Sequence, residues 1–142
     1  RVMTYRLPGQ TLLHSMKISL SAHNVSHYSP GGRMQASQAR DKVHSELLAG
    51  MIDKLKATKE VDGTRLFDHV ALAFGSNISS IHYLDNCPTI LAGGGANLKL
   101  GQHLVLPKDT PLCNVWLTLL HGMGIKAERH GDSSGVLTQL QG

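Results

Sequence analysis

The strongest constraint on the fold is a long stretch, from about residue 34 to 57, in which apolar side chains recur at helical spacing. Its apolar positions are Val43, Leu47, Leu48, Met51, Ile52 and Leu55. Side chains three or four residues apart lie on one face of an α-helix, and charged residues such as Asp41 and Glu46 fall elsewhere around it. The sequence therefore predicts one long amphipathic helix here.

Apolar runs on both sides of this helix are typical of β-strands. Alternation predicts strands over residues 1–7 and near residues 16–20, and continuous apolar runs predict buried strands within 66–74 and over 88–92. A helix that crosses between two strands of one sheet makes a βαβ unit, whose strands are parallel. With a second helix over residues 111–121, the pattern predicts an α/β fold, a partial sheet of mainly parallel strands with flanking helices.

Composition and charge narrow the class of protein. The chain has 142 residues, of which 41% are hydrophobic, and this suits a single domain over residues 1–142. Lys and Arg number 14 against 10 Asp and Glu, but they are scattered singly without interleaved aromatic residues, so we expect no nucleic-acid partner. No run approaches the roughly 18 consecutive apolar residues that cross a bilayer, so no membrane span is expected in this chain. The first residues also lack the apolar region of a signal peptide.

The stretch "SAHNVSHY", residues 21–28, is the main candidate for a site. It places His23 and His27 four residues apart in a predicted loop that follows a predicted strand. A second such loop carries His82 and Asp85. Ligands of open α/β sheets bind at the carboxyl ends of the strands, where these loops would lie. His23, His27, His82 and Asp85 are therefore candidate ligands of zinc or a similar divalent metal.

Two other interpretations of the same stretch stay open. Ser26 is a candidate nucleophile that His23 or His27 would activate, but the spacing displays neither an orienting third group nor an oxyanion hole. Loop histidines are more often solvated or bonded to the backbone than bound to a metal, so a structured polar loop is the alternative. Cys87 and Cys113 are compatible with a disulfide or with two buried thiols.

Several motifs in order carry a family resemblance: "HNVSHY", "GSNISSIHYLDNCPTILAGGG", "GQHLVLPKDTPLCNVWLTLLHGMGI" and "HGDSSG". Together they resemble the C-terminal part of an exported bacterial family of unknown function, named for its HXXSHH motif. The resemblance covers essentially the whole chain, and the family's full domain is considerably longer. It implies that the chain is the C-terminal portion of a larger family domain. It also implies an exported, periplasmic or extracellular location and a fold similar to the alkaline-phosphatase and sulfatase superfamily.

The resemblance also assigns residues. His23 and His27 stand at the first and second motif histidines, Ser26 at the motif serine, and His82 at a histidine of the later loop. The match is incomplete, because Tyr28 stands where the last motif histidine is expected. Leu84 likewise stands where many relatives have a histidine. Each departure removes a potential ligand.

Two functions of different classes follow. The first is a metal-dependent hydrolase of the phosphatase and sulfatase type, with a divalent metal such as zinc as cofactor. The second is a non-catalytic accessory or structural subunit of a larger extracytoplasmic or membrane-associated complex. In either case we expect a protein partner, or the N-terminal portion of the same domain, to cover apolar surface that a βα fragment leaves exposed.

Overall fold

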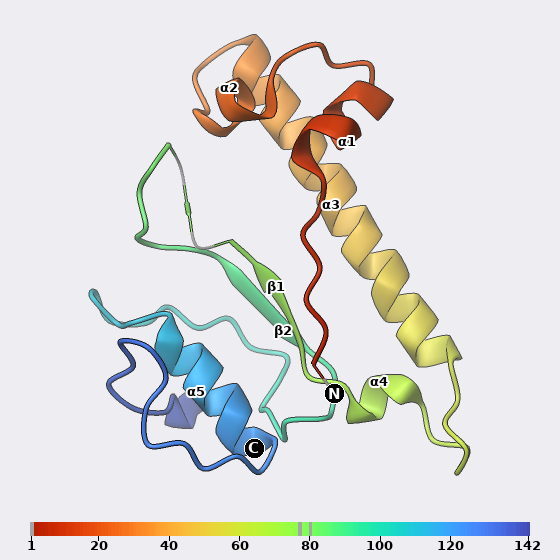
Figure 1. Ribbon diagram of the computed structural model, residues 1–142, viewed down its shortest axis with the longest axis vertical. Coiled ribbons are helices and arrows are strands. Elements are labelled where there is room, and N and C mark those ends of the chain that lie inside the picture. Colours follow the sequence, from red (N-terminus) through yellow and green to blue (C-terminus); the bar gives the residue numbers. More distant parts are fainter. Residues whose placement is uncertain (1, 77, 80) are drawn as a thin grey trace. The chain divides into compact units, whose positions relative to one another are not determined.

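The computed structural model describes residues 2–76, 78–79 and 81–142 (Figure 1). Its elements are α1 (Gly9–Ser15), α2 (Ala22–Ser26), α3 (Gly32–Ala57), α4 (Leu66–His69), β1 (Leu72–Gly75), β2 (Thr89–Ala92), α5 (Cys113–Gly122) and the 3-10 helix η1 (Thr138–Leu140). The chain forms two compact units. Unit 1 comprises Arg1–Met51 and Ile78–Leu84, and unit 2 comprises Ile52–Asn77 and Asp85–Gly142.

Unit 1 is built around a small core where its helices meet. Leu13 of α1, Val25 of α2 and Ala36 of α3 are buried together. The segment between α1 and α2 is fastened by one side chain, because Gln10 Oε1 accepts from the Ala22 N–H at 2.7 Å and its Nε2 donates to the Leu20 carbonyl at 3.4 Å. These contacts fix the entry of the chain into α2.

The histidine motif, predicted as a loop, forms the short helix α2 in the structure. Ser21 caps it, since the Ser21 Oγ accepts from the Asn24 N–H at 3.1 Å. His27 is the C-cap residue of α2, and the following residue, Tyr28, has a φ of +36°. A left-handed residue directly after the last helical one is a common way to end a helix.

Helix α3 confirms the prediction of a long helix, and it begins and ends within a few residues of the expected limits. Its buried residues, Ala36 and Ser37, lie near its start, where the core of unit 1 lies. The predicted apolar face is only partly covered, because Leu47 and Met51 are both nearly half exposed.

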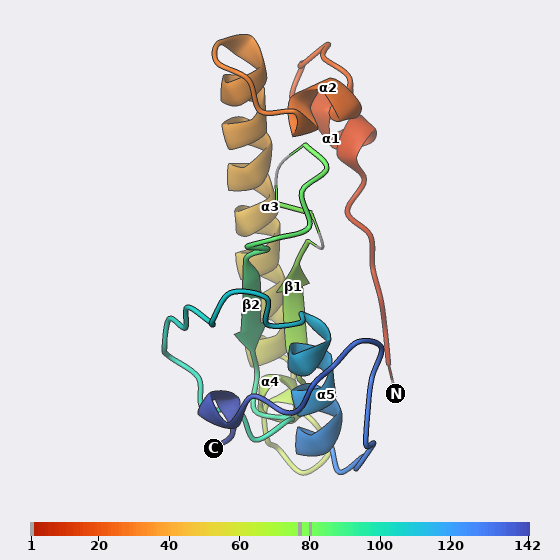
Figure 2. The same ribbon diagram turned by 90° about the vertical axis from the view of Figure 1, so that its left-hand side faces the viewer.

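Unit 2 contains an antiparallel hairpin and the helix α5. Strand β1 pairs with β2 from Leu72 opposite Ala92 to Gly75 opposite Thr89, and Figure 2 shows the two arrows running in opposite directions. The glycines after β2 pack directly on the backbone of α4, where the Gly94 N–H donates to the Phe67 carbonyl at 3.0 Å. A side chain at Gly94 would collide with the Asp68 carbonyl.

Helix α5 confirms the predicted second helix and organises the C-terminal region. Its buried Thr118 donates to the Asn114 carbonyl at 2.7 Å and accepts from the Leu137 N–H at 2.8 Å. The Asn114 side chain bonds both the backbone N–H and the hydroxyl of Ser134. The "HGDSSG" segment is thus held to α5 by hydrogen bonds.

The predicted fold class is wrong. The described chain is mostly helical, and its one sheet has two antiparallel strands rather than mainly parallel ones. No strand forms over the described residues 2–7 or over 16–20, so α3 has no first strand to cross from. Residues 66–69, expected to begin a strand, form α4 instead. The strand over 88–92 is present as β2, but β1 precedes it through a direct connection and the two pair as a hairpin.

Two further expectations concern the cysteines and a membrane span. Cys87 and Cys113 are not joined by a disulfide among the described residues. Of the helices that the structure describes, none combines the length and the apolar character that crossing a membrane requires.

Candidate functional site

Three histidine rings meet in unit 1. His23 and His27 come from α2 and its C-cap, and His82 comes from the segment Ile78–Leu84, here called the His82 loop. The ring centroids lie 4.6 Å apart for His23 and His27, and 5.3 Å apart for His27 and His82. His23 and His82 complete the triangle at 6.1 Å. We call these three residues the histidine cluster.

Local structure explains how the cluster forms. His23 and His27 are four residues apart, so the helical conformation of α2 places their side chains on one face. The His82 loop is tied to the end of α2, since the Ile81 N–H donates to the Ser26 carbonyl at 3.4 Å. Within the loop, the Ser79 N–H donates to the Tyr83 carbonyl at 3.0 Å. Residues distant in the sequence are thereby brought together.

The spacing of the rings suits a shared ion. Three imidazoles that each bond a tetrahedral zinc ion at about 2.0–2.1 Å have ring centroids about 5 Å apart, close to the separations above. Among the described residues, however, no group of three or more His, Cys, Asp or Glu has its donor atoms set to hold a metal ion. Binding an ion would therefore require the imidazole rings to rotate about their side-chain bonds.

The environment of His27 favours its neutral form. Its Nε2 is buried and has no hydrogen-bond partner among the described residues. This burial is the main cause that lowers the pKa of His27 below its ordinary value. The positive charges of His23, His82 and Arg33 lower that pKa further. A neutral imidazole is the form that binds a metal.

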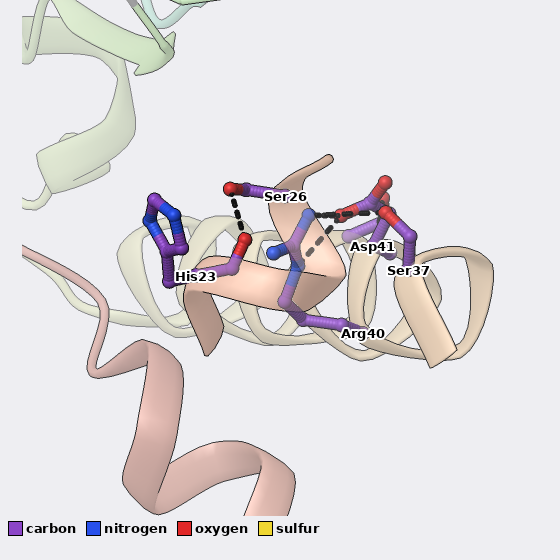
Figure 3. Close-up of polar contacts among 6 residues, drawn as sticks. His23, Ser26, Ser37, Arg40 and Asp41 are labelled. Atoms are coloured by element: carbon purple, nitrogen blue, oxygen red, sulfur yellow. Dashed lines mark hydrogen bonds and ion pairs between the residues drawn. The ribbon is translucent and has the colours of Figure 1, made fainter. Parts of the chain in front are cut away.

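The Ser26 hydroxyl serves the backbone. It donates to the His23 carbonyl at 2.7 Å, the contact shown in Figure 3. Bonds from a serine to the carbonyl one turn earlier are common in helices and satisfy the hydroxyl locally. The contact does not link Ser26 to an imidazole, so it gives no support to an activated nucleophile.

Asp85, the fourth predicted ligand, belongs to unit 2. It begins the second segment of unit 2, whereas the three histidines belong to unit 1. Its carbonyl accepts from the Cys87 thiol at 3.8 Å. The role of Asp85 as a ligand stays a prediction.

The sequence does not predict a role for two ionisable groups near these elements. Arg33, two residues into α3, acts electrostatically on His27, and nothing in its spacing signals this. His44 of α3 has a buried Nε2 that lacks a partner among the described residues. Burial lowers the pKa of His44, the charge of Arg40 lowers it further, and Asp41 partly offsets both. The partial burial of His44 could be predicted from the sequence, because His44 stands four residues before Leu48 on the apolar side of the predicted helix.

Arg40, whose charge acts on His44, is held in place by side-chain contacts. Its guanidinium donates to the Ser37 hydroxyl at 3.2 Å and forms an ion pair with Asp41 at 3.0 Å (Figure 3).

A second hydrogen-bonded chain of polar side chains lies in unit 2. The Thr64 hydroxyl is 2.6 Å from Asp62 Oδ1 and 2.6 Å from His69 Nε2. Asp62 also accepts from the Thr64 N–H at 2.9 Å. The bond from the Thr64 hydroxyl, and after it the bond from the Thr64 N–H, lowers the pKa of Asp62. All three groups are exposed, and their bonds close the turn before α4.

Searches of protein-family models, curated proteins and solved structures find no match to this chain. The family resemblance therefore rests on the sequence motifs alone and stays an expectation.

Proposed function

We propose that the chain binds one divalent transition-metal ion, such as zinc, through His23, His27 and His82. The observation that carries the proposal is the meeting of three imidazole rings at 4.6, 5.3 and 6.1 Å between centroids. Two of these residues share a helical turn and the third comes from a distant loop. Chance placement of surface histidines would not favour three mutual contacts.

The chemistry of the donors favours a particular class of ion. Imidazole nitrogens suit zinc, copper, nickel and cobalt, whereas magnesium and calcium prefer oxygen ligands. The pKa of His27 is lowered, so this ring is available as a neutral donor near neutral pH. Its buried Nε2, which has no partner among the described residues, would gain one in the ion.

Three protein ligands would leave a coordination position open. Open positions distinguish catalytic zinc sites from structural ones, which use four protein ligands. A metal bound in this way supplies Lewis acidity and an activated water for ester hydrolysis. We therefore propose a metal-dependent hydrolase, of the phosphatase and sulfatase type that the motif resemblance implies, as the first candidate function.

A specific observation favours a second candidate, a non-catalytic binding subunit. The His82 loop exposes apolar side chains, with Tyr83 at 62% and Leu84 at 72% exposure, and Tyr28 beside His27 is 46% exposed. Clustered apolar exposure around a site is typical of surfaces that a partner covers. In this case the ion would order the surface that the partner recognises.

The test of metal binding is zinc titration of the purified chain by isothermal titration calorimetry, with metal content measured by mass spectrometry. We expect one equivalent of zinc in the native chain and its loss in His82→Ala. His103→Ala is the matched control, because His103 is an exposed histidine of unit 2 and its variant should bind as the native chain does. Absence of zinc binding in the native chain, or full binding by His82→Ala, would contradict the proposal.

The two candidate functions are separated by turnover. The zinc-loaded chain is assayed with p-nitrophenyl phosphate, sulfate and acetate. Hydrolysis that disappears in His82→Ala supports the hydrolase. Stoichiometric zinc without turnover of any ester supports the binding subunit instead.

A further inference from the structure

The sequence contains a single Asp-Gly pair, Asp62-Gly63, in the turn that precedes α4. Such pairs are prone to a spontaneous rearrangement, because glycine has no side chain that keeps the neighbouring carboxyl group away from its backbone nitrogen. Gly63 has a φ of +84°, and outside its chain neighbours no described atom lies within 4 Å of the place where its Cβ would stand. Asp62 and Thr64, on either side of it, are exposed. Water therefore reaches both reacting groups.

The rearrangement needs only the chain itself and water. The Gly63 nitrogen attacks Asp62 Cγ, a carbon–nitrogen bond forms, and the carboxyl hydroxyl leaves with the amide proton as water. The product is a cyclic succinimide. Water then adds to the former main-chain carbonyl of Asp62 and breaks its bond to the Gly63 nitrogen, which leaves isoaspartate. Addition of water at Cγ instead restores aspartate.

Hydrogen bonds hold both reacting groups in the folded turn. The Gly63 N–H donates to the Glu60 carbonyl at 3.0 Å. Asp62 Oδ1 accepts from the Thr64 hydroxyl at 2.6 Å and from the Thr64 N–H at 2.9 Å. The hydroxyl bond is the main cause that lowers the pKa of Asp62. The carboxyl group is thereby kept ionised, and an ionised carboxylate has no hydroxyl that can leave as water.

His69 directs the Thr64 hydroxyl toward Asp62. The Thr64 oxygen lies 2.6 Å from His69 Nε2. A hydroxyl has one proton to donate, and an ionised carboxylate can only accept. The Thr64 proton is therefore donated to Asp62, and His69 Nε2 carries the proton that it donates to the Thr64 oxygen. None of these residues belongs to the histidine cluster.

We propose that Asp62-Gly63 is a site of spontaneous modification, whose conversion to isoaspartate is limited by the hydrogen bonds of Thr64. Isoaspartate routes the backbone through Cβ and Cγ, which adds a carbon atom to the turn. The turn is closed by the bond from the Glu60 N–H to the Thr64 carbonyl at 2.9 Å. A longer backbone between these two residues disturbs that bond, so the modification loosens the connection between α3 and α4.

The test is incubation of the folded chain at neutral pH, with isoaspartate measured by an isoaspartyl methyltransferase and located by peptide mapping. Thr64→Val removes the hydroxyl and keeps the backbone N–H. We expect it to form isoaspartate about five-fold faster than the native chain, the effect of one hydrogen bond on an equilibrium. Thr64→Ser keeps the hydroxyl and should stay within about two-fold of native. Thr58→Val is the matched control, because the Thr58 hydroxyl is also exposed but bonds the Lys54 carbonyl.

The unfolded chain separates protection by the turn from an effect of residue type. In urea, the native chain and Thr64→Val should react at one rate, faster than that of the folded native chain. Asp62→Glu in the Thr64→Val chain should abolish the signal, because glutamate closes the corresponding larger ring much less readily.

Equal rates in folded native chain and folded Thr64→Val would overturn the inference. A folded native chain that reacts as fast as the unfolded one would overturn it as well. The second comparison uses the native chain alone, so it decides the question even if Thr64→Val does not fold.

Discussion

The imidazole rings of His27 and His82 meet edge to face, with planes at 90° and centroids 5.3 Å apart. One ring belongs to a short helix and the other to a loop far along the chain, so their contact depends on the tertiary structure of unit 1. Anything that binds both rings should therefore stabilise that structure.

Zinc should raise the thermal stability of the native chain. An ion that binds the folded state alone, at a free concentration one hundred times its Kd, adds about 2.7 kcal/mol to the free energy of unfolding. We expect a rise in Tm of roughly 10 °C by differential scanning calorimetry, reversed by a chelator. His27→Ala should abolish the rise. A rise of equal size in that variant would place the bound zinc elsewhere.

Ser26→Ala should leave zinc affinity within about two-fold of native, because the hydroxyl bonds the His23 carbonyl rather than a ring. Loss of this local hydrogen bond should change the free energy of unfolding by only about 0.5 kcal/mol. Calorimetric zinc titration and urea unfolding measure the two quantities. If the metal-loaded chain hydrolyses an ester and Ser26→Ala loses that activity with zinc still bound, Ser26 has a catalytic role that this geometry does not support.

The pH dependence of stability should report on His44 and on His27, because the pKa of each is lowered in the folded protein. Each pKa lies below the ordinary value of 6.5, so below that pH the unfolded chain binds a proton that the folded chain does not. The free energy of unfolding should therefore fall as pH drops below about 6.5 and continue to fall until the folded pKa is passed. Urea unfolding between pH 5 and pH 7.5, about one unit or more on either side, measures the slope.

His44→Leu should reduce this slope, leaving the contribution of His27, and raise stability by about 1 kcal/mol, because it replaces a buried nitrogen with no partner among the described residues by an apolar group. His14→Leu is the control, since His14 is exposed and hydrogen-bonded to Gln10 at 2.9 Å. An unchanged slope in His44→Leu would show that other groups cause the acid dependence.

Two glycine substitutions should have opposite effects. Gly94→Ala places a methyl group against the Asp68 carbonyl of α4, which should lower the free energy of unfolding by about 1–3 kcal/mol. Gly50→Ala lies inside α3, where a methyl group meets no atom within 4 Å, and should raise it by about 0.5–1 kcal/mol. Thermal unfolding of the two variants provides the comparison. Equal effects would mean that α4 does not pack closely on the chain after β2.

The elements that sequence reasoning predicted well are those whose pattern is local. Helix α3 follows from apolar spacing alone, and β2 and α5 follow from short apolar runs with clear ends. The capped helix α2 carried a readable signal as well, a serine at position 21 three residues before Asn24. The sequence analysis nevertheless predicts a loop over this motif, whereas the structure has a short helix there.

The predicted strand pairing is wrong for a physical reason. Alternating apolar residues such as Val2, Met3 and Tyr5 indicate an extended chain, but a strand also needs a neighbour to hydrogen-bond, and periodicity does not identify one. Those three side chains are in fact highly exposed. Parallel pairing was inferred from a crossover helix, and without a first strand that inference had no basis.

The candidate site was predicted in part. The sequence predicts that His23, His27 and His82 belong to one site, and the structure places their rings near one another. Their role as metal ligands stays a prediction. The effect of Arg33 on His27 depends on where α3 begins in space. The hydrogen bond from the Ile81 N–H to the Ser26 carbonyl likewise joins residues far apart in the sequence, which no local pattern predicts.

The meeting of His27 and His82 has a consequence for chain entropy. An ion bound by both would close a loop made of all the residues between positions 27 and 82, which include α3, α4 and β1. In the chain-entropy model, a permanent crosslink around a loop of this length lowers the entropy of the unfolded chain and so raises its free energy by about 4 kcal/mol. A metal ion at this point would act as a reversible counterpart of a disulfide, fastening the chain when metal is abundant and releasing it when metal is withdrawn.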